Sequence, residues 1–153
     1  LFRSKTPEAT ALPIALTAPV EGGIIRVYAM DSLIYSKTLN QWMTHPGVDI
    51  AAPKGTEVRT VLAGVVESVR DDDLLGTTVI ISHADGIKTV YANLRKEPPV
   101  KEGQKVEARQ VIGCVGDTAI SECAEQTHLH FELYIQGSPA DPQKYVTFAS
   151  LPA

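Results

Sequence analysis

Short runs rich in valine, isoleucine and threonine recur roughly every ten residues along this chain, and clusters of glycine, proline and aspartate separate them. Runs this short are typical of β-strands, because an ordinary helix needs a longer segment with an apolar residue at every third or fourth position. We therefore expect an all-β domain with a largely antiparallel sheet. The strands that we expect are residues 23–30, 64–70, 77–83, 87–94, 110–116 and 128–135.

Two shorter features refine this expectation. The loop Ala84-Asp85-Gly86 is a tight hairpin signal, since Gly86 can take the positive φ that such a turn needs. We expect the strands on either side of it, 77–83 and 87–94, to be antiparallel neighbours. The segment 35–43, YSKTLNQWM, is the one stretch in which we expect a helical turn or two.

The length and charge of the chain limit the classes of protein that it can belong to. Its 153 residues are enough for one domain, and the net charge of −4 gives it no electrostatic reason to bind a nucleic acid. We expect residues 1–15 to form a linker or flexible arm and residues 16–153 to form the domain. Because the chain begins with Leu1, we also expect a targeting or anchor segment ahead of it.

The two cysteines, Cys114 and Cys123, are too few for a disulfide scaffold and too far apart for a CxxC site. We expect Cys114, in the apolar run VIGCVG, to be buried. A single bridge between the two cysteines stays open as an alternative if the domain is exported.

Two of the four histidines lie one residue apart in the run HLHFELYI, residues 128–135. Side chains alternate between the faces of a strand, so one face carries His128, His130, Glu132 and Tyr134 and the other is apolar. We expect the apolar face to pack on the core and both imidazoles to address one site. Alone, such a pair is weak evidence for a metal, because two hydrogen-bonded surface histidines would give the same pattern.

A second cluster, His45-Pro46-Gly47-Val48-Asp49, adds the ligand types that the pair lacks. In an extended chain the four-residue offset places His45 and Asp49 on the same side, and Gly47 leaves that side unobstructed. Two histidines and one carboxylate, with a fourth position for water, are the ligand set of a catalytic zinc site. The two clusters together therefore predict a site for one zinc ion.

HPGVD at 45–49 and HLHFE at 128–132 resemble the paired HxGxD and HxH signatures of the LytM/lysostaphin family of zinc endopeptidases, which cleave peptide cross-bridges in peptidoglycan. Residues 49–66, 79–94 and 100–116 follow the framework of that family in order, so the resemblance covers about residues 45–145. It implies an antiparallel sheet of the LytM/lysostaphin type, with an open groove that holds the metal site.

Carried over by position, the resemblance makes His45, Asp49 and His130 the ligands of the zinc ion and His128 the residue that helps to activate the water. Along a strand His128 and His130 lie about 6.5–7 Å apart, at ~3.3 Å per residue. One of them can therefore bind the metal while the other reaches the water or the substrate beside it.

One position departs from the pattern of the active members. They usually carry a second catalytic histidine in a Tyr-x-His-Leu segment, where this chain has Tyr91-Ala92-Asn93-Leu94. An amide can donate a hydrogen bond to an oxyanion, but it cannot transfer a proton near neutral pH. Losing a proton-transfer group removes a factor of roughly 10²–10⁴ from the rate. We expect His83 to hydrogen-bond within the hairpin beside Asp85 and not to replace the missing group.

Asn93 and the loop 116–127, together with the segments YSKTLNQWMTHPGVDI at 35–50 and LLGTTVIISHADGIKTVYANL at 74–94, resemble the SpoIIQ branch of this family. Members of that branch are envelope proteins of endospore-forming bacteria. That resemblance implies a membrane anchor ahead of Leu1, an extracytoplasmic location between forespore and mother cell, and a mother-cell partner like SpoIIIAH. We therefore expect a zinc-binding scaffold with impaired catalysis. The alternative is an active zinc endopeptidase that acts on peptidoglycan peptides with His128 and zinc alone. A biotinyl or lipoyl carrier is excluded, because the chain has no Met-Lys or Asp-Lys hairpin.

Overall fold

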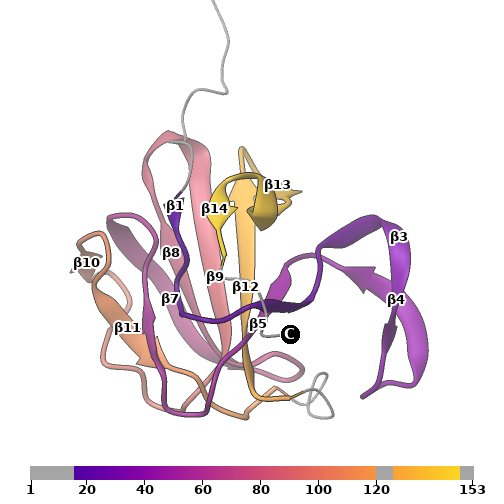
Figure 1. Cartoon of the computed structure of the whole chain (residues 1–153). Helices are drawn as coiled ribbons and strands as arrows, with labels where there is room; N and C mark the ends of the chain where they lie inside the picture. The colour runs from indigo at the N-terminus through magenta and orange to yellow at the C-terminus, as the bar shows by residue number, and fades with distance from the viewer. Residues whose placement is uncertain (1–15, 120–125, 149–153) are drawn as a thin grey trace, which may run out of the picture.

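The computed structural model describes residues 16–119 and 126–148, and strands dominate this part of the chain (Figure 1). Two single turns of 3-10 helix, η2 (Ala84–Gly86) and η4 (Pro142–Lys144), are the described helical elements. The all-β expectation is confirmed. The strands in chain order are β1 (Leu16–Thr17), β2 (Ile24–Arg26), β3 (Ala29–Ser36), β4 (Gln41–His45), β5 (Val48–Ala51), β6 (Glu57–Arg59), β7 (Gly64–Asp72), β8 (Gly76–Ser82), β9 (Ile87–Leu94), β10 (Lys105–Val106), β11 (Val111–Cys114), β12 (His128–Ile135), β13 (Ser138–Ala140) and β14 (Val146–Thr147).

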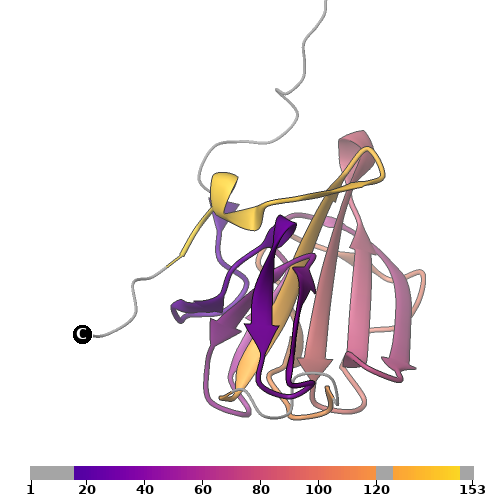
Figure 2. The ribbon, with the colours of Figure 1, turned by 90° about the vertical axis from the view of Figure 1, so that its right-hand side faces the viewer.

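One large antiparallel sheet organises the fold, with strand order β10-β7-β8-β9-β12-β5-β2 and with β13 paired to the end of β12. The long strands of this sheet lie side by side in Figure 2. Three small ladders complete the structure: β6 with β11, β3 with β4, and the parallel pair β1 with β14. Strand β12 lies between β9 and β5, so its side chains contact residues from both halves of the chain.

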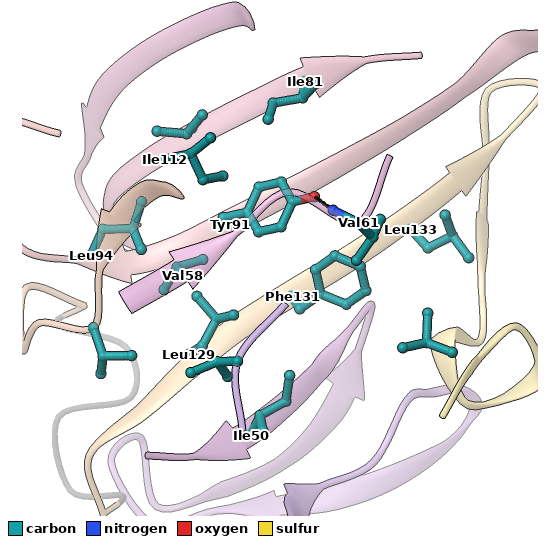
Figure 3. Packing of buried hydrophobic residues seen from close by; sticks show 14 of the residues in the cluster. Ile50, Val58, Val61, Ile81, Tyr91, Leu94, Ile112, Leu129, Phe131 and Leu133 are labelled. Carbon is teal, nitrogen blue, oxygen red and sulfur yellow. Dashed lines mark hydrogen bonds between the residues drawn. The ribbon is translucent and has the colours of Figure 1, made fainter. Parts of the chain in front are cut away.

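The core lies on the face of the sheet that the alternation of β12 predicts. Leu129, Phe131 and Leu133 are fully buried there, and Val58 of β6 and Ile112 of β11 belong to the same cluster (Figure 3). The short ladder of β6 and β11 therefore helps to cover this apolar face of the large sheet.

Tyr91 is the one tyrosine of the described residues that is fully buried, and its hydroxyl is saturated with hydrogen bonds. The oxygen accepts from the backbone N–H of Val61 at 3.1 Å, drawn in Figure 3, and from the hydroxyl of Thr89 at 2.8 Å. It donates to the hydroxyl of Thr60 at 3.3 Å. The phenol thus joins β9 to the loop that follows β6.

Removing this hydroxyl leaves buried donors without an acceptor. We expect Tyr91→Phe to lower the free energy of unfolding by about 1–3 kcal/mol, the usual cost of an unsatisfied buried polar group. Urea denaturation measures it. Tyr35→Phe is the matched control, because that hydroxyl is bonded to Asn40 on an exposed hairpin and its loss should change stability by less than about 0.5 kcal/mol. Equal losses in the two variants would contradict the structural role of Tyr91.

The hairpin between β8 and β9 agrees with the turn chemistry of its sequence. The two strands are antiparallel neighbours, and both Asp85 and Gly86 have positive φ, at 63° and 75°. The expected hairpin is therefore confirmed.

The helical turn expected at residues 35–43 is wrong. These residues form the turn of the β3–β4 hairpin and the parts of both strands that adjoin the turn. The hairpin stands away from the rest of the molecule in Figure 1. Tyr35 lies opposite Trp42, and their rings make an edge contact at 5.6 Å. A cross-strand aromatic pair, together with Asn40 at φ 53°, stabilises a hairpin where the composition alone favoured a helix. The expected strand 23–30 is likewise divided between β2 and β3.

Some expectations fall outside the described residues, namely the linker at 1–15 and any bridge to Cys123. Cys114 is described and is partly exposed, not buried, because it ends β11 opposite the exposed Glu57. Between residues 16 and 148, outside the gap at 120–125, no helix is long and apolar enough to cross a membrane.

Candidate metal centre

The register of β5 against β12 brings the two sequence clusters together. His130 lies directly opposite Asp49 across this antiparallel pair. His45 is the last residue of β4 and reaches the same place through the short link to β5. One ring nitrogen each of His45 and His130 and one carboxylate oxygen of Asp49 lie within 4.8 Å of one another. The structure therefore brings together the three residues that the sequence predicts as ligands.

Gly47 allows this link to lie against β12. A Cβ atom at this position would be 2.3 Å from the carbonyl oxygen of Phe131 and 2.8 Å from Cγ of Glu132. Neither distance is compatible with a methyl group, so the segment from His45 to Asp49 can approach β12 this closely only with glycine.

Gly47→Ala tests this close approach. We expect it to lower the free energy of unfolding by about 1–3 kcal/mol, because the methyl group must displace backbone in a packed region. Gly113→Ala is the control. The nearest atom to its Cβ would be Cδ1 of Leu94 at 3.3 Å, the end of a flexible side chain, so its cost should be smaller. Urea denaturation of both variants decides, and an equal or smaller loss for Gly47→Ala would contradict the packing argument.

Backbone carbonyls orient two of the three histidines. Nδ1 of His45 lies 3.1 Å from the carbonyl oxygen of Val27, and Nδ1 of His128 lies 2.7 Å from that of Gln126. A carbonyl oxygen only accepts, so both Nδ1 atoms carry a proton and donate it. This leaves Nε2 of each ring without a proton in the neutral form, and both Nε2 atoms point toward Asp49.

Asp49 is the centre of the group. Its Oδ1 lies 2.8 Å from Nδ1 of His130 and 3.3 Å from Nε2 of His45, and its Oδ2 lies 3.8 Å from Nε2 of His128. The guanidinium of Arg26 on β2 is 3.5 Å from Oδ2. All five side chains are at most 7% exposed. A buried carboxylate must be compensated by cations or hydrogen bonds, and here it has both.

His130 is held on its other side by a carboxylate. Its Nε2 lies 2.8 Å from Oε2 of Glu132, and the hydroxyl of Tyr134 donates to Oε1 of Glu132 at 2.7 Å. Burial raises the pKa of the Glu132 carboxyl, but the hydrogen bonds and the charge of His130 outweigh it, and the pKa lies below its ordinary value. Glu132 is therefore ionised near neutral pH.

Asn93 stands where the active members of the LytM/lysostaphin family carry a second catalytic histidine. Both polar atoms of its side chain are hydrogen-bonded to backbone groups. Its Nδ2 donates to the carbonyl oxygen of His128 at 2.8 Å, and its Oδ1 accepts from the N–H of Ala119 at 2.8 Å. The residue is buried and has φ 62°, a conformation that asparagine tolerates better than most residues. Asn93 thus fixes the start of β12 and the segment after β11.

His83 lies elsewhere on the sheet. Its Nδ1 is 2.8 Å from the carbonyl oxygen of Ala63 and its Nε2 is 2.7 Å from the hydroxyl of Thr89. Burial lowers the pKa of His83, and the hydrogen bond to Ala63 opposes this. Thr89 belongs to the β8–β9 hairpin, so the expected hydrogen bonding of His83 within that hairpin is confirmed. The bond to Ala63 also joins the hairpin to the loop before β7.

A cleft of about 330 Å³ lies on the same sheet face as His130 and reaches the centre through Glu132. Its lining mixes apolar side chains with charged groups of both signs, namely Glu67, Arg70, Asp72, Lys88 and Glu132, and with the hydroxyl of Tyr134.

The donor set of the centre fits zinc. Two imidazole nitrogens and one carboxylate oxygen, without sulfur, are ligands that Zn²⁺ accepts, and they leave a further coordination position for water or substrate. Sequence reasoning missed Arg26, which lies 23 residues before Asp49 and joins the centre only through the pairing of β2 with β5. It also assigned no role to Glu132, although the alternation of β12 places Glu132 on the same face as His130.

Relatives of the chain are consistent with this geometry. The model of peptidase family M23 matches residues 43–142, which include His45, Asp49, His128 and His130. DD-carboxypeptidase/endopeptidase Mpg of Neisseria meningitidis serogroup B is 40% identical over 104 residues, which are 68% of this chain and 23% of that protein. Stage II sporulation protein Q of Bacillus subtilis is 36% identical over 109 residues, 70% of this chain and 38% of that protein.

The fold has a solved counterpart as well. A chain in the structure of the SpoIIQ–SpoIIIAH pore-forming complex superposes with a TM-score of 0.73 at 30% identity, and the match covers 87% of this chain and 91% of that chain. The sequence matches span much less of the two relatives named above, 23% and 38% of their lengths. Because the family model matches well over half of the residues, the chain belongs to peptidase family M23, the family of the LytM-type domains.

Proposed function

We propose that this chain is the zinc-binding LytM-type domain of a cell-envelope protein and that it serves as an interaction scaffold with impaired peptidase chemistry. The observation that carries the proposal is Asn93. Its amide cannot transfer a proton near neutral pH, and both of its polar atoms are engaged by backbone groups. The position from which an active member of the family supplies its second histidine thus has a structural task in this chain.

His45, Asp49 and His130 would hold one zinc ion, with His128 beside them. Zinc bound there would polarise a peptide carbonyl and activate a water molecule. Nε2 of His128 can accept a proton, since Nδ1 of that ring donates to the carbonyl oxygen of Gln126. Without a second histidine, proton transfer depends on His128 alone, and the rate falls by roughly 10²–10⁴.

Two of the similar proteins support a proposal for the partner and the location. Stage II sporulation protein Q resembles this domain in sequence, and a chain in the structure of the SpoIIQ–SpoIIIAH pore-forming complex resembles it in fold. We therefore propose a SpoIIIAH-like partner from the mother cell. The domain would lie outside the cytoplasm, in the space between forespore and mother cell, and a membrane anchor would precede it.

An active zinc endopeptidase that cleaves peptidoglycan cross-bridges is the second candidate. Two observations favour it: the three ligand residues converge with His128 beside them, and a DD-carboxypeptidase/endopeptidase is 40% identical over 104 residues. The two candidates differ in one measurable property, which is zinc-dependent cleavage of peptidoglycan by the unmodified chain.

The test pairs metal analysis with digestion. Elemental analysis of the purified domain should find one zinc per chain, and incubation with purified peptidoglycan, with or without added zinc, should release no soluble peptides. The Neisseria meningitidis Mpg protein on the same substrate is the positive control. Peptide release that a chelator stops would contradict the scaffold proposal and favour the endopeptidase. A chain that binds no zinc would refute the metal site.

A further inference from the structure

We propose that Glu132 is a positioning residue of the metal centre, which turns His130 so that Nδ1 is presented to the metal, and that Tyr134 holds Glu132 in place. The inference rests on the proposed zinc site and adds to it the residues that set the orientation of one ligand.

The contact geometry supports this role directly. His130, Glu132 and Tyr134 occupy alternate positions on one face of β12, and each contacts the next. One carboxylate oxygen of Glu132 is 2.8 Å from Nε2 of His130, and the other accepts from the Tyr134 hydroxyl at 2.7 Å. Both oxygens of a nearly buried carboxylate are therefore committed, and the side chain has one orientation available.

The identity of the ligand atom depends on this contact. A neutral imidazole has one protonated nitrogen and one with a free lone pair, and only the latter can bind a metal. In this structure both ring nitrogens of His130 face carboxylate oxygens, Nδ1 that of Asp49 and Nε2 that of Glu132, each at 2.8 Å. A metal ion bound by Asp49 and His130 would take the place of the proton between them. The carboxylate of Glu132 keeps the other proton on Nε2, so the lone pair for the metal would be on Nδ1. Such a carboxylate also makes the ligand nitrogen a stronger donor.

The three histidines of the centre differ in the group that accepts the proton of the ring and so fixes its orientation. His45 and His128 donate to backbone carbonyls, which no substitution removes, whereas His130 relies on a side chain. The space for that side chain comes from Gly47, since a Cβ there would be 2.8 Å from Cγ of Glu132. Ligand orientation at His130 can therefore be tested by mutation.

Zinc affinity of the purified domain, measured by competition with a chromophoric chelator, is the primary readout. We expect Glu132→Ala to weaken zinc binding by about 10–100-fold, as is typical when the carboxylate partner of a ligating histidine is lost. Glu132→Gln should weaken it less, because an amide oxygen still accepts from Nε2 but carries no charge. Tyr134→Phe should weaken it least, because it frees only one oxygen of Glu132.

Two further measurements separate positioning from simple loss of stability. Tyr91→Phe also removes a hydroxyl from the large sheet and should destabilise the fold, yet it should leave zinc affinity unchanged. In the zinc-loaded domain, ¹⁵N-edited NMR should show a slowly exchanging Nε2 proton on His130 in the wild type and in Glu132→Gln. That signal should be lost or exchange faster in Glu132→Ala. The Gln and Phe variants, which are nearly isosteric, carry the test should the Ala variant fail to fold.

The outcomes distinguish the inference from the proposal beneath it. Zinc binding by the wild type and equal affinity in all Glu132 and Tyr134 variants would overturn the positioning role and leave the zinc site standing. A wild type that binds no zinc would overturn both. Equal weakening by Tyr91→Phe and Tyr134→Phe would also overturn the positioning role, since the effect would then come from general destabilisation.

Discussion

Asp49→Ala is expected to weaken zinc binding by more than about 100-fold, a larger loss than removal of an outer hydrogen-bond partner causes, and to lower the unfolding free energy of the metal-free domain by about 3–5 kcal/mol. The carboxylate is fully buried and faces three histidines and the guanidinium of Arg26. Its removal takes away a predicted ligand and also breaks a buried ion pair.

Asp49→Asn separates these two effects, because it keeps the shape of the side chain and loses only the charge. Asp117→Ala is the control. Asp117 pairs with Lys54 at 2.9 Å on the surface, where both side chains are more than half exposed, so its loss should cost under about 1 kcal/mol and leave zinc binding unchanged. Chelator competition and urea denaturation of the metal-free protein give the two quantities. Zinc affinity within tenfold of the wild type in Asp49→Ala would mean that the ion binds elsewhere.

Asn93→His is expected to raise the rate of peptidoglycan cleavage by roughly 10²–10⁴ over that of the unmodified domain, the usual contribution of a proton-transfer group. Position 93 has φ 62°, and histidine is among the residues that adopt this region more often than most. The imidazole cannot reproduce both amide hydrogen bonds, so the free energy of unfolding should fall by about 1–3 kcal/mol.

Asn93→Ala supplies the matched comparison, since it loses the same hydrogen bonds to His128 and Ala119 and gains no imidazole. It should be destabilised to a similar extent and remain inactive. Release of soluble peptides from purified peptidoglycan, at equal zinc loading of all variants, is the measurement. If Asn93→His cleaves no faster than Asn93→Ala, the missing histidine is not what limits the chemistry of this domain.

The parts of the fold that are local in sequence could be predicted. The strand HLHFELYI has the expected bounds and faces, because a period of two depends only on the chain itself. The hairpin at Asp85-Gly86 was also predictable, because the turn depends only on residues that are neighbours in the chain. The segment 35–43 was not, because its strand state depends on the contact between Tyr35 and Trp42 across a turn.

The site divides in the same way. His45, Asp49 and His130 could be named from their spacing and family resemblance, and the structure places them together. Arg26 joins them through the register of β2 on β5, which no local pattern encodes. The hydrogen bonds of Asn93 to the backbone could not be predicted either, because Ala119 lies 26 residues away along the chain.

The projecting hairpin of β3 and β4 ends in His45, whereas Asp49 and His130 belong to the large sheet. An ion bound by all three residues would therefore hold the β3–β4 hairpin against the large sheet. Occupancy of the metal site would then determine how tightly the hairpin is held to the rest of the domain. This hairpin carries the exposed side chains of Leu33, Tyr35 and Trp42. Such a structural use of the metal would be a reason to keep its ligands where, as we propose, catalysis is impaired.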